Sequence, residues 1–183
     1  MNVNHYAQKI SEALTQILST VNETELQRLI SELRQAKRVF VYGKGRSGIV
    51  MRMFAMRLMH LGLTAYVVDE PTTPSIGKND LLLIASGSGK TGSCQLLARL
   101  AKEAEASVGL ISATGGSLIA QNSDFSVVLP VGAVLAQSTT TKQFGGSYFE
   151  QALLICFDAV IAYLQELLGV SNELMQSRHS NLE

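Results

Sequence analysis

The sequence predicts an α/β fold, a three-layer α/β/α sandwich around a five-stranded parallel sheet. The first observation is the apolar run Leu81–Ala85, which lacks polar alternation and is typical of a strand covered on both faces. The second is that such runs alternate with segments of helical period. The third is that two of these strands, ending at Tyr42 and Ala85, lead directly into glycine-rich loops.

Two helices are expected before the first strand. Residues 4–19 and 23–36 both carry apolar side chains at helical spacing. Asn22 is the expected N-cap of the second helix, and Glu25, three residues further on, would complete a capping box. This helical pair, 4–36, either covers the sheet or meets another subunit.

Strands and helices then alternate, which predicts right-handed crossovers between parallel strands. The strands are expected at residues 38–42, 64–68, 81–85, 107–111 and 125–129. The helices are expected at 47–61, 91–104 and, briefly, 117–121. Residues 130–143, with Thr139–Thr141 at their centre, are expected to be irregular. A long apolar helix at 146–168, a short helix at 172–176 and a polar tail complete the chain.

Composition excludes several classes of protein. Of the 183 residues 46% are apolar and 16% charged, with 15 basic and 15 acidic side chains, so no basic field indicates nucleic acid. Cys94 and Cys156 lack metal-ligand spacing and are expected to be buried thiols of a cytoplasmic protein. We expect one domain spanning 1–183, with no signal peptide and no apolar run of membrane-spanning length.

The loop Ser86–Thr91 has the composition of an anion site. Its glycines let the backbone approach a phosphate, its hydroxyls can donate hydrogen bonds, and the following helix directs free N–H groups toward it. A nucleotide P-loop is an alternative suggested by Gly89-Lys90-Thr91, but Ile84 stands where that motif requires glycine. A turn without a ligand is the other alternative.

The loop Gly43–Gly48 matches the Gly-x-Gly-x-x-Gly dinucleotide fingerprint, and Asp69 ends the next strand as that fingerprint requires. Its variable positions, however, hold Lys44, Arg46 and Ser47 rather than small apolar residues. The chain also places a second glycine and hydroxyl loop on a neighbouring strand. Two such loops at one sheet edge favour a small phosphorylated ligand held between them.

Together these segments resemble the sugar isomerase (SIS) domain family, a flavodoxin- or Rossmann-like fold, and within it the 6-phospho-3-hexuloisomerases. The glycine loops indicate the wider family, and the segment Phe54–Gly62 and the C-terminal tail make the resemblance specific. It covers nearly the whole chain. The matching segments are Gly45–Gly48, Phe54–Gly62, Thr73-Pro74, Ser86–Gly89, Phe149–Gln151, Phe157–Val160 and Arg178–Glu183.

The resemblance implies conversion of D-arabino-3-hexulose 6-phosphate to fructose 6-phosphate through an enediol, in the ribulose monophosphate route of formaldehyde fixation or detoxification. It implies no metal and no organic cofactor, and a homotetramer with sites near subunit contacts. A sugar phosphate is the expected ligand, without nucleic acid or membrane partners. Isomerisation of another sugar phosphate, such as an arabinose, sedoheptulose or amino-sugar phosphate, and non-catalytic sensing of a sugar phosphate are alternatives.

The resemblance also implies roles for individual residues. Glu150 matches the proposed base, although a glutamate in the first turn of a helix also complements the helix dipole. His60 and His179 are candidate proton shuttles, with a helix-end contact and simple solvation as their alternatives. Arg46 is a candidate for stabilising the enediolate, or else a surface arginine. The expected sugar and phosphate contacts are Gly45, Ser47, Ser86, Gly87, Ser88, Lys90 and Thr91.

Two features depart from the family pattern. Lys90 stands where glutamate is expected, within the loop that would hold the phosphate. The segment Lys142–Glu150 lacks the proline that precedes the corresponding glutamate in the family. Both leave the identity of the sugar phosphate open.

Overall fold

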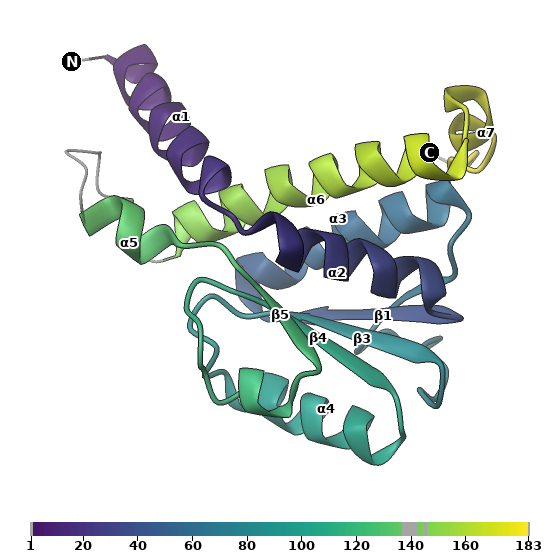
Figure 1. Ribbon diagram of the computed structural model, residues 1–183. Helices are drawn as coiled ribbons and strands as arrows, with labels where there is room; N and C mark the ends of the chain where they lie inside the picture. The colour runs from purple at the N-terminus through teal and green to yellow at the C-terminus, as the bar shows by residue number, and fades with distance from the viewer. Residues whose placement is uncertain (1, 137–142, 145, 183) are drawn as a thin grey trace.

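A computed structural model of the 183-residue chain describes residues 2–136, 143–144 and 146–182. Five parallel strands form one sheet in the order β2-β1-β3-β4-β5, as Figure 1 shows. The strands are β1 (Arg38–Gly43), β2 (Ala65–Val67), β3 (Asp80–Ala85), β4 (Ser107–Ser112) and β5 (Phe125–Val128). All five lie where the apolar runs predict them. Every residue of the central strand β3 is buried, as a run without alternation requires.

Helices cover both faces of the sheet, which confirms the three-layer prediction. Side chains at alternate strand positions, such as Val41 and Leu83, pack with α1 (Val3–Ser19), α2 (Glu23–Gln35), α3 (Gly45–Leu61) and α6 (Ser147–Leu168). The intervening positions, such as Tyr42 and Ile84, pack with α4 (Gly92–Glu103) on the opposite face. Two-residue periodicity along each strand therefore divides the apolar side chains into two cores.

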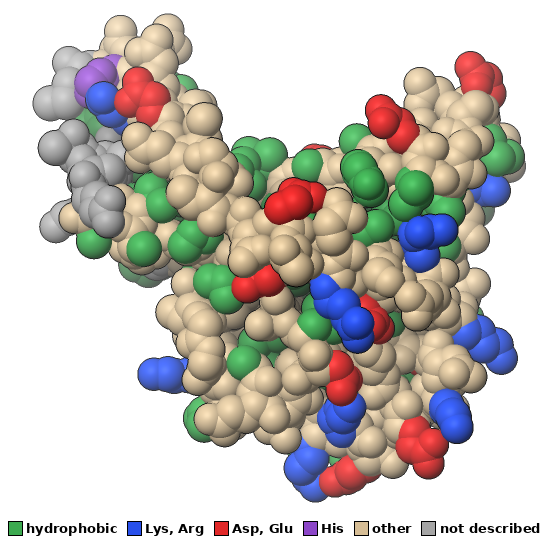
Figure 2. Space-filling model, in the orientation of Figure 1, with side chains coloured by type: hydrophobic (Ala, Val, Ile, Leu, Met, Phe, Trp, Pro, Cys, Tyr) green, Lys and Arg blue, Asp and Glu red, His purple; other side chains and the backbone are tan. Residues whose placement is uncertain are grey.

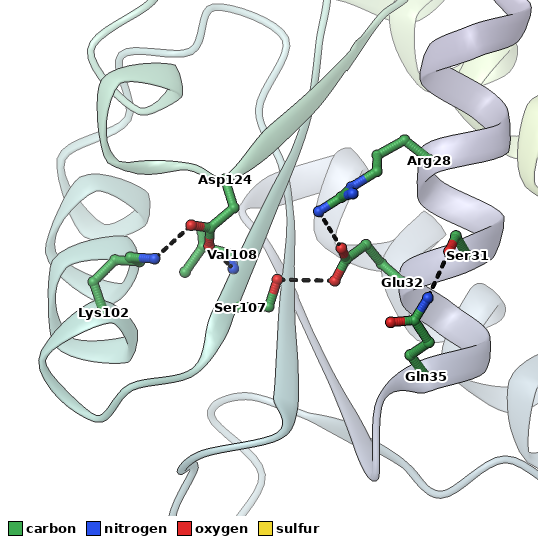
Figure 3. A network of polar contacts seen from close by, with 8 residues as sticks. All are labelled: Arg28, Ser31, Glu32, Gln35, Lys102, Ser107, Val108 and Asp124. Atoms are coloured by element: carbon green, nitrogen blue, oxygen red, sulfur yellow. Dashed lines mark hydrogen bonds and ion pairs between the residues drawn. The ribbon is translucent and has the colours of Figure 1, made fainter.

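Helix α2 lies over the β4–β5 edge of the sheet and is held there by polar contacts (Figure 3). Glu32 forms an ion pair with Arg28 and accepts a hydrogen bond of 3.0 Å from the Ser107 hydroxyl. Asn22 caps the helix by accepting from the Thr24 N–H, as predicted. Glu25 does not complete the capping box; it accepts from the Val128 N–H of the edge strand at 2.8 Å, because that strand has no neighbour to accept its hydrogen bond.

The segment 130–143 differs from its prediction. The structure contains a helix, α5 (Val131–Ala136), where no regular structure was expected. It follows Pro130, a residue compatible with a helix start, and packs against α1. The threonine-rich centre, Thr139–Thr141, lies outside the described residues. The short helix expected at 117–121 is a 3₁₀ turn, η1 (Ala120–Asn122), and α7 (Asn172–Ser177) precedes the tail.

The expectation that no apolar stretch reaches membrane-spanning length is wrong for α6. This 22-residue helix has a mean hydropathy of 1.5 over its most apolar window, enough to cross a membrane by length and composition only. In the fold it is a core helix, and Phe157 stacks on Phe54 of α3 with ring centroids 3.9 Å apart. Its outer face keeps exposed apolar side chains, and Figure 2 shows hydrophobic groups gathered along it.

Candidate active site

Both glycine loops begin at the same edge of the sheet. Gly43, the last residue of β1, pairs in register with Ala85, the last residue of β3. The two loops therefore leave the sheet side by side, and each leads into a helix, α3 after the first loop and α4 after the second. Parallel sheets bind ligands at this carboxyl edge. The predicted adjacency of the two loops is confirmed.

Internal hydrogen bonds fold the loop Ser86–Thr91 into a tight turn. The Ser86 and Thr91 hydroxyl oxygens lie 3.1 Å apart, and the Gly89 N–H donates to the Ser86 carbonyl at 3.0 Å. The Ser88 hydroxyl accepts from the Lys90 N–H at 3.2 Å. Ser88 and Lys90 are exposed, whereas Ser86 is buried beneath them. The loop thus presents hydroxyls and a lysine at the sheet edge.

The turn after β4 holds this loop from behind. The Gly87 carbonyl accepts hydrogen bonds from the Ala113 N–H at 3.1 Å and the Ser112 hydroxyl at 3.4 Å. The Gly89 carbonyl accepts from the Ile119 N–H at 3.2 Å. Because C=O and N–H point in opposite directions across a trans peptide, these contacts direct the following N–H groups away from β4.

Two glycines of the loop are required by close packing. Gly89 has a φ of +62°, and a Cβ added there would lie 2.2 Å from the buried hydroxyl of Ser117. A Cβ at Gly87 would lie 3.1 Å from the ring of Phe149, the residue before Glu150. The sequence predictions give Ser112 and Ser117 no role at the site, so their bracing of the loop was missed. Their hydroxyls, at the same sheet edge as the loop, were the available signal.

The glycines of the fingerprint Gly43–Gly48 also have a structural reason. A Cβ at Gly48 would lie 2.5 Å from the Gly43 carbonyl oxygen, so the close approach of helix to strand requires glycine there. Gly45 starts α3 with a φ of +56°. Asp69, which would bind a ribose in a dinucleotide site, forms an ion pair of 3.1 Å with Lys44. These contacts account for the fingerprint without a dinucleotide.

Glu150 lies in the first turn of α6, facing the start of α3. Its Oε2 is 3.3 Å from Nε of Arg46, and its Oε1 is 3.5 Å from the Ser47 hydroxyl. The Glu150 side chain is only 14% exposed, and a Cβ at Gly146 would lie 3.1 Å from Oε1. A hollow of about 250 Å³ opens beside it, lined by Arg46, Ile49, Val50, Glu150, Gln151 and Leu154. The structure therefore brings three predicted site residues together.

His60 and His179 also meet, but elsewhere. Their rings stack with centroids 5.2 Å apart; His60 is 2% exposed and His179 is exposed. Arg178 donates to the His60 carbonyl at 2.8 Å and anchors the tail. A hollow of about 380 Å³ beside the rings includes Arg57 and Asp158. His60 is 14 residues from Arg46 along α3, about 21 Å, so one chain does not bring the histidines to Glu150.

Possible metal ligands do not converge in the part of the chain that the structure describes. Within residues 2–136, 143–144 and 146–182, no three side chains among His, Cys, Asp and Glu are placed to hold a metal ion. Cys94 and Cys156 are buried free thiols, and burial raises the pKa of each to about 11. At neutral pH these thiols are protonated and unreactive.

These features define a class of protein: an α/β sandwich with an anion-type loop and a carboxylate at the carboxyl edge of its sheet. Comparison with known families is more specific, because the model of the SIS domain matches residues 32–153. The chain belongs to the SIS domain family.

Several relatives of similar length share one name. A 3-hexulose-6-phosphate isomerase from Mycobacterium gastri is 38% identical over 95% of this chain and 88% of its own length. One from Bacillus subtilis (strain 168) is 36% identical over the full length of both. A crystal structure from Methanococcus jannaschii, described as inferring that same molecular function, has a TM-score of 0.83 and 35% identity, covering 97% of this chain and 98% of that one.

Proposed function

We propose that this protein is a sugar-phosphate isomerase that converts 3-hexulose 6-phosphate to fructose 6-phosphate. The observation that carries the proposal is Glu150, a carboxylate beside an anion-type loop, in a chain with several full-length relatives that are named for that activity. The ribulose monophosphate route, which fixes or detoxifies formaldehyde, is consistent with this reaction.

The proposed reaction moves a carbonyl from C3 to C2 without any net oxidation. Glu150 removes the proton from C2 of the 3-ketose, and the electron pair of that C–H bond forms the 2,3-enediolate. The proton taken from C2 returns to C3, and the proton of the C2 hydroxyl passes to the C3 oxygen, so that C2 becomes the carbonyl carbon and C3 carries a hydroxyl. Arg46, whose Nε lies 3.3 Å from Oε2 of Glu150, is placed to stabilise the negative charge of the enediolate.

The phosphate group is assigned to the loop Ser86–Thr91. Its hydroxyls, its backbone N–H groups and the start of α4 are all suited to an anion. The exposed Lys90 supplies a positive charge at this edge, where the family pattern has glutamate. Gly45 and Ser47 complete the sugar-binding side from the start of α3, where Ser47 already contacts Glu150.

The proposal includes a homotetramer in the cytoplasm. His60 lies about 21 Å from Arg46 along α3, and His179 stacks on it, so their role as proton shuttles requires a second copy to bring them to Glu150. The proposal also treats residues 1–183 as one SIS domain. In its support, α1, α2 and α6 share a single hydrophobic core with β1 and β3.

Turnover of enzymatically prepared 3-hexulose 6-phosphate tests the proposal. The wild-type protein is expected to form fructose 6-phosphate, and Glu150→Gln to lose about 10²- to 10⁴-fold in kcat, because an amide cannot accept the proton. Glu166→Gln, an exposed glutamate on the same helix, is the matched control and keeps its activity. Arabinose, sedoheptulose and amino-sugar phosphates are assayed in parallel. No turnover of 3-hexulose 6-phosphate by the wild type rejects the assignment.

A further inference from the structure

Gln151 lines the hollow beside Glu150 and is paired with a second amide. The Gln143 amide donates to Oε1 of Gln151 at 2.9 Å, and the Gln151 amide donates back to Oε1 of Gln143 at 3.3 Å. This reciprocal pair fixes the orientation of both amides, because turning one of them alone would set donor against donor and acceptor against acceptor. Among the contacts of the described residues, the pair uses one N–H and one oxygen lone pair of Gln151, and the second of each remains for a ligand.

The hollow lies on the side of Glu150 away from the loop Ser86–Thr91. Successive residues of a helix are turned by about 100°. Phe149 faces the loop, since a Cβ at Gly87 would lie 3.1 Å from its ring, and Glu150 faces the start of α3. Gln151 is therefore turned by about 200° from Phe149 and points away from the loop. In agreement, the described residues that line the hollow come from α3 and α6 and none from the loop.

The order of the carbons in a 3-hexulose 6-phosphate matches this order of groups. Its phosphate is on C6, and its reacting carbons, C2 and C3, lie toward the other end of the chain. With the phosphate on the loop Ser86–Thr91 and C2 at Glu150, C1 and its hydroxyl extend past the carboxylate. The hollow there, of about 250 Å³, has room for this group. In an aldose phosphate the reacting carbons are C1 and C2, so no carbon extends past the base.

We propose that Gln151 binds the C1 hydroxyl of the substrate and thereby makes the site specific for ketoses whose carbonyl moves between C3 and C2. The inference rests on the proposed function, because it places C2 at Glu150. Of the other five described residues that line the hollow, three are apolar, and the remaining two, Arg46 and Glu150, take part in the proposed chemistry. Gln151 is thus the lining side chain left to bind a hydroxyl.

The spare groups of Gln151 suit a hydroxyl in particular. Its second N–H can donate to the C1 oxygen, while its carbonyl oxygen accepts the C1 hydroxyl proton. A substrate without this hydroxyl leaves the half-buried amide without a partner, which lowers its affinity. Gln143 acts only through Gln151 and is a positioning residue.

Calorimetric titration with fructose 6-phosphate and with 1-deoxyfructose 6-phosphate, which lacks only the C1 hydroxyl, tests the contact. Wild type should bind fructose 6-phosphate about tenfold more tightly, the effect of one hydrogen bond. Gln151→Leu, similar in size and placed among apolar side chains, should bind both alike. Gln35→Leu is the matched control, since this exposed glutamine pairs with Ser31 of its own helix, and it keeps the preference. Equal binding by wild type, or an unchanged preference in Gln151→Leu, overturns the inference.

Two further variants separate the contact from the pairing that positions it. Gln151→Asn retains the amide but is one methylene shorter, so it should also lose most of the preference. Gln143→Ala leaves Gln151 in place but free to turn, and its preference should fall between those of wild type and Gln151→Leu. A wild-type preference in Gln143→Ala overturns the positioning role, and one in Gln151→Asn overturns the contact.

Turnover separates a failure of this inference from a failure of the proposed function. Gln151→Leu should raise KM for 3-hexulose 6-phosphate about tenfold with little change in kcat, because the C1 contact is the same in substrate and transition state. A fall in kcat at unchanged KM, or a wild type that isomerises an arabinose phosphate as efficiently as 3-hexulose 6-phosphate, overturns the inference alone. A wild type that does not isomerise 3-hexulose 6-phosphate rejects the proposed function, and the inference with it.

Discussion

At the scale of single residues, the contact between Glu150 and Arg46 is the one on which the proposed chemistry rests. The carboxylate lies 3.3 Å from the guanidinium and 3.5 Å from the Ser47 hydroxyl. Both partners belong to the first turn of α3, whose N–H groups add positive potential. The same two partners that hold the Glu150 carboxylate in position would also offer donors to the proposed enediolate.

Gly89 is the residue whose replacement should most disturb the loop Ser86–Thr91. Gly89→Ala is expected to lower the free energy of unfolding by more than about 2 kcal/mol, because it combines a left-handed φ with overlap on Ser117. Gly92→Ala, at the start of α4 with nothing within 4 Å, is the control and should be neutral or slightly stabilising. Urea unfolding measures both, and equal effects would contradict this account of the loop.

The residues of the loops were predictable, because their composition is unusual and their place after a strand is visible in the sequence. The separation of the histidines from Glu150 was overlooked, although it follows from helix geometry. Once residues 47–61 are predicted to be helical, the rise per residue separates Arg46 from His60 by about 21 Å. The contact between His60 and His179 was not predictable, since it depends on how the tail folds back.

At the scale of elements, an ion pair between Arg38 and Asp80, the first residues of β1 and β3, joins the two strands. Asp80 is 1% exposed and accepts from Nε of Arg38 at 2.9 Å and from the Gly77 N–H at 2.8 Å. Burial alone would raise the pKa of Asp80, but the hydrogen bonds from Arg38 and Gly77 outweigh it and lower the pKa. The pair sets the register of the two strands that carry the site.

This lowered pKa predicts how stability depends on pH. A carboxylate whose pKa is lower when folded stabilises the protein above its unfolded pKa of about 4, and this stabilisation is lost as the pH falls through the folded value. Thermal unfolding of Asp80→Asn should therefore change less between pH 5 and pH 2 than that of wild type. At pH 7 the variant should be less stable than wild type, because a neutral amide no longer pairs with the charge of Arg38. If the unfolding temperatures of wild type and Asp80→Asn fell by the same amount between pH 5 and pH 2, this account of Asp80 would be refuted.

Strands were predicted more reliably than the segments at the sheet margin. A short apolar run without polar alternation, bounded by turn residues, fits few structures besides a buried strand, so all five strands were found. Glu25 was misassigned because a helix N-terminus and an edge strand both have N–H groups that need an acceptor. Only the tertiary structure shows that the Val128 N–H is the one that donates to the Glu25 carboxylate. The helix α5 was missed because its six residues, Val131–Ala136, are too few to show helical periodicity.

At the scale of the whole molecule, α3 and α6 pack together and carry most of the proposed catalytic residues. They run together from the Arg46–Glu150 contact, past the stacked Phe54 and Phe157 rings, to the two histidines. One end holds the proposed base, and the other holds the proposed proton shuttles.

The central claim is that Glu150 isomerises a 3-ketose phosphate through an enediol, and the reaction in D₂O tests it most directly. NMR of the product should show fructose 6-phosphate with solvent deuterium at C3, because the base exchanges the proton taken from C2 before returning it. Glu150→Gln should give neither product nor exchange, while Glu166→Gln should give both. Undiminished formation of fructose 6-phosphate by Glu150→Gln would contradict the account.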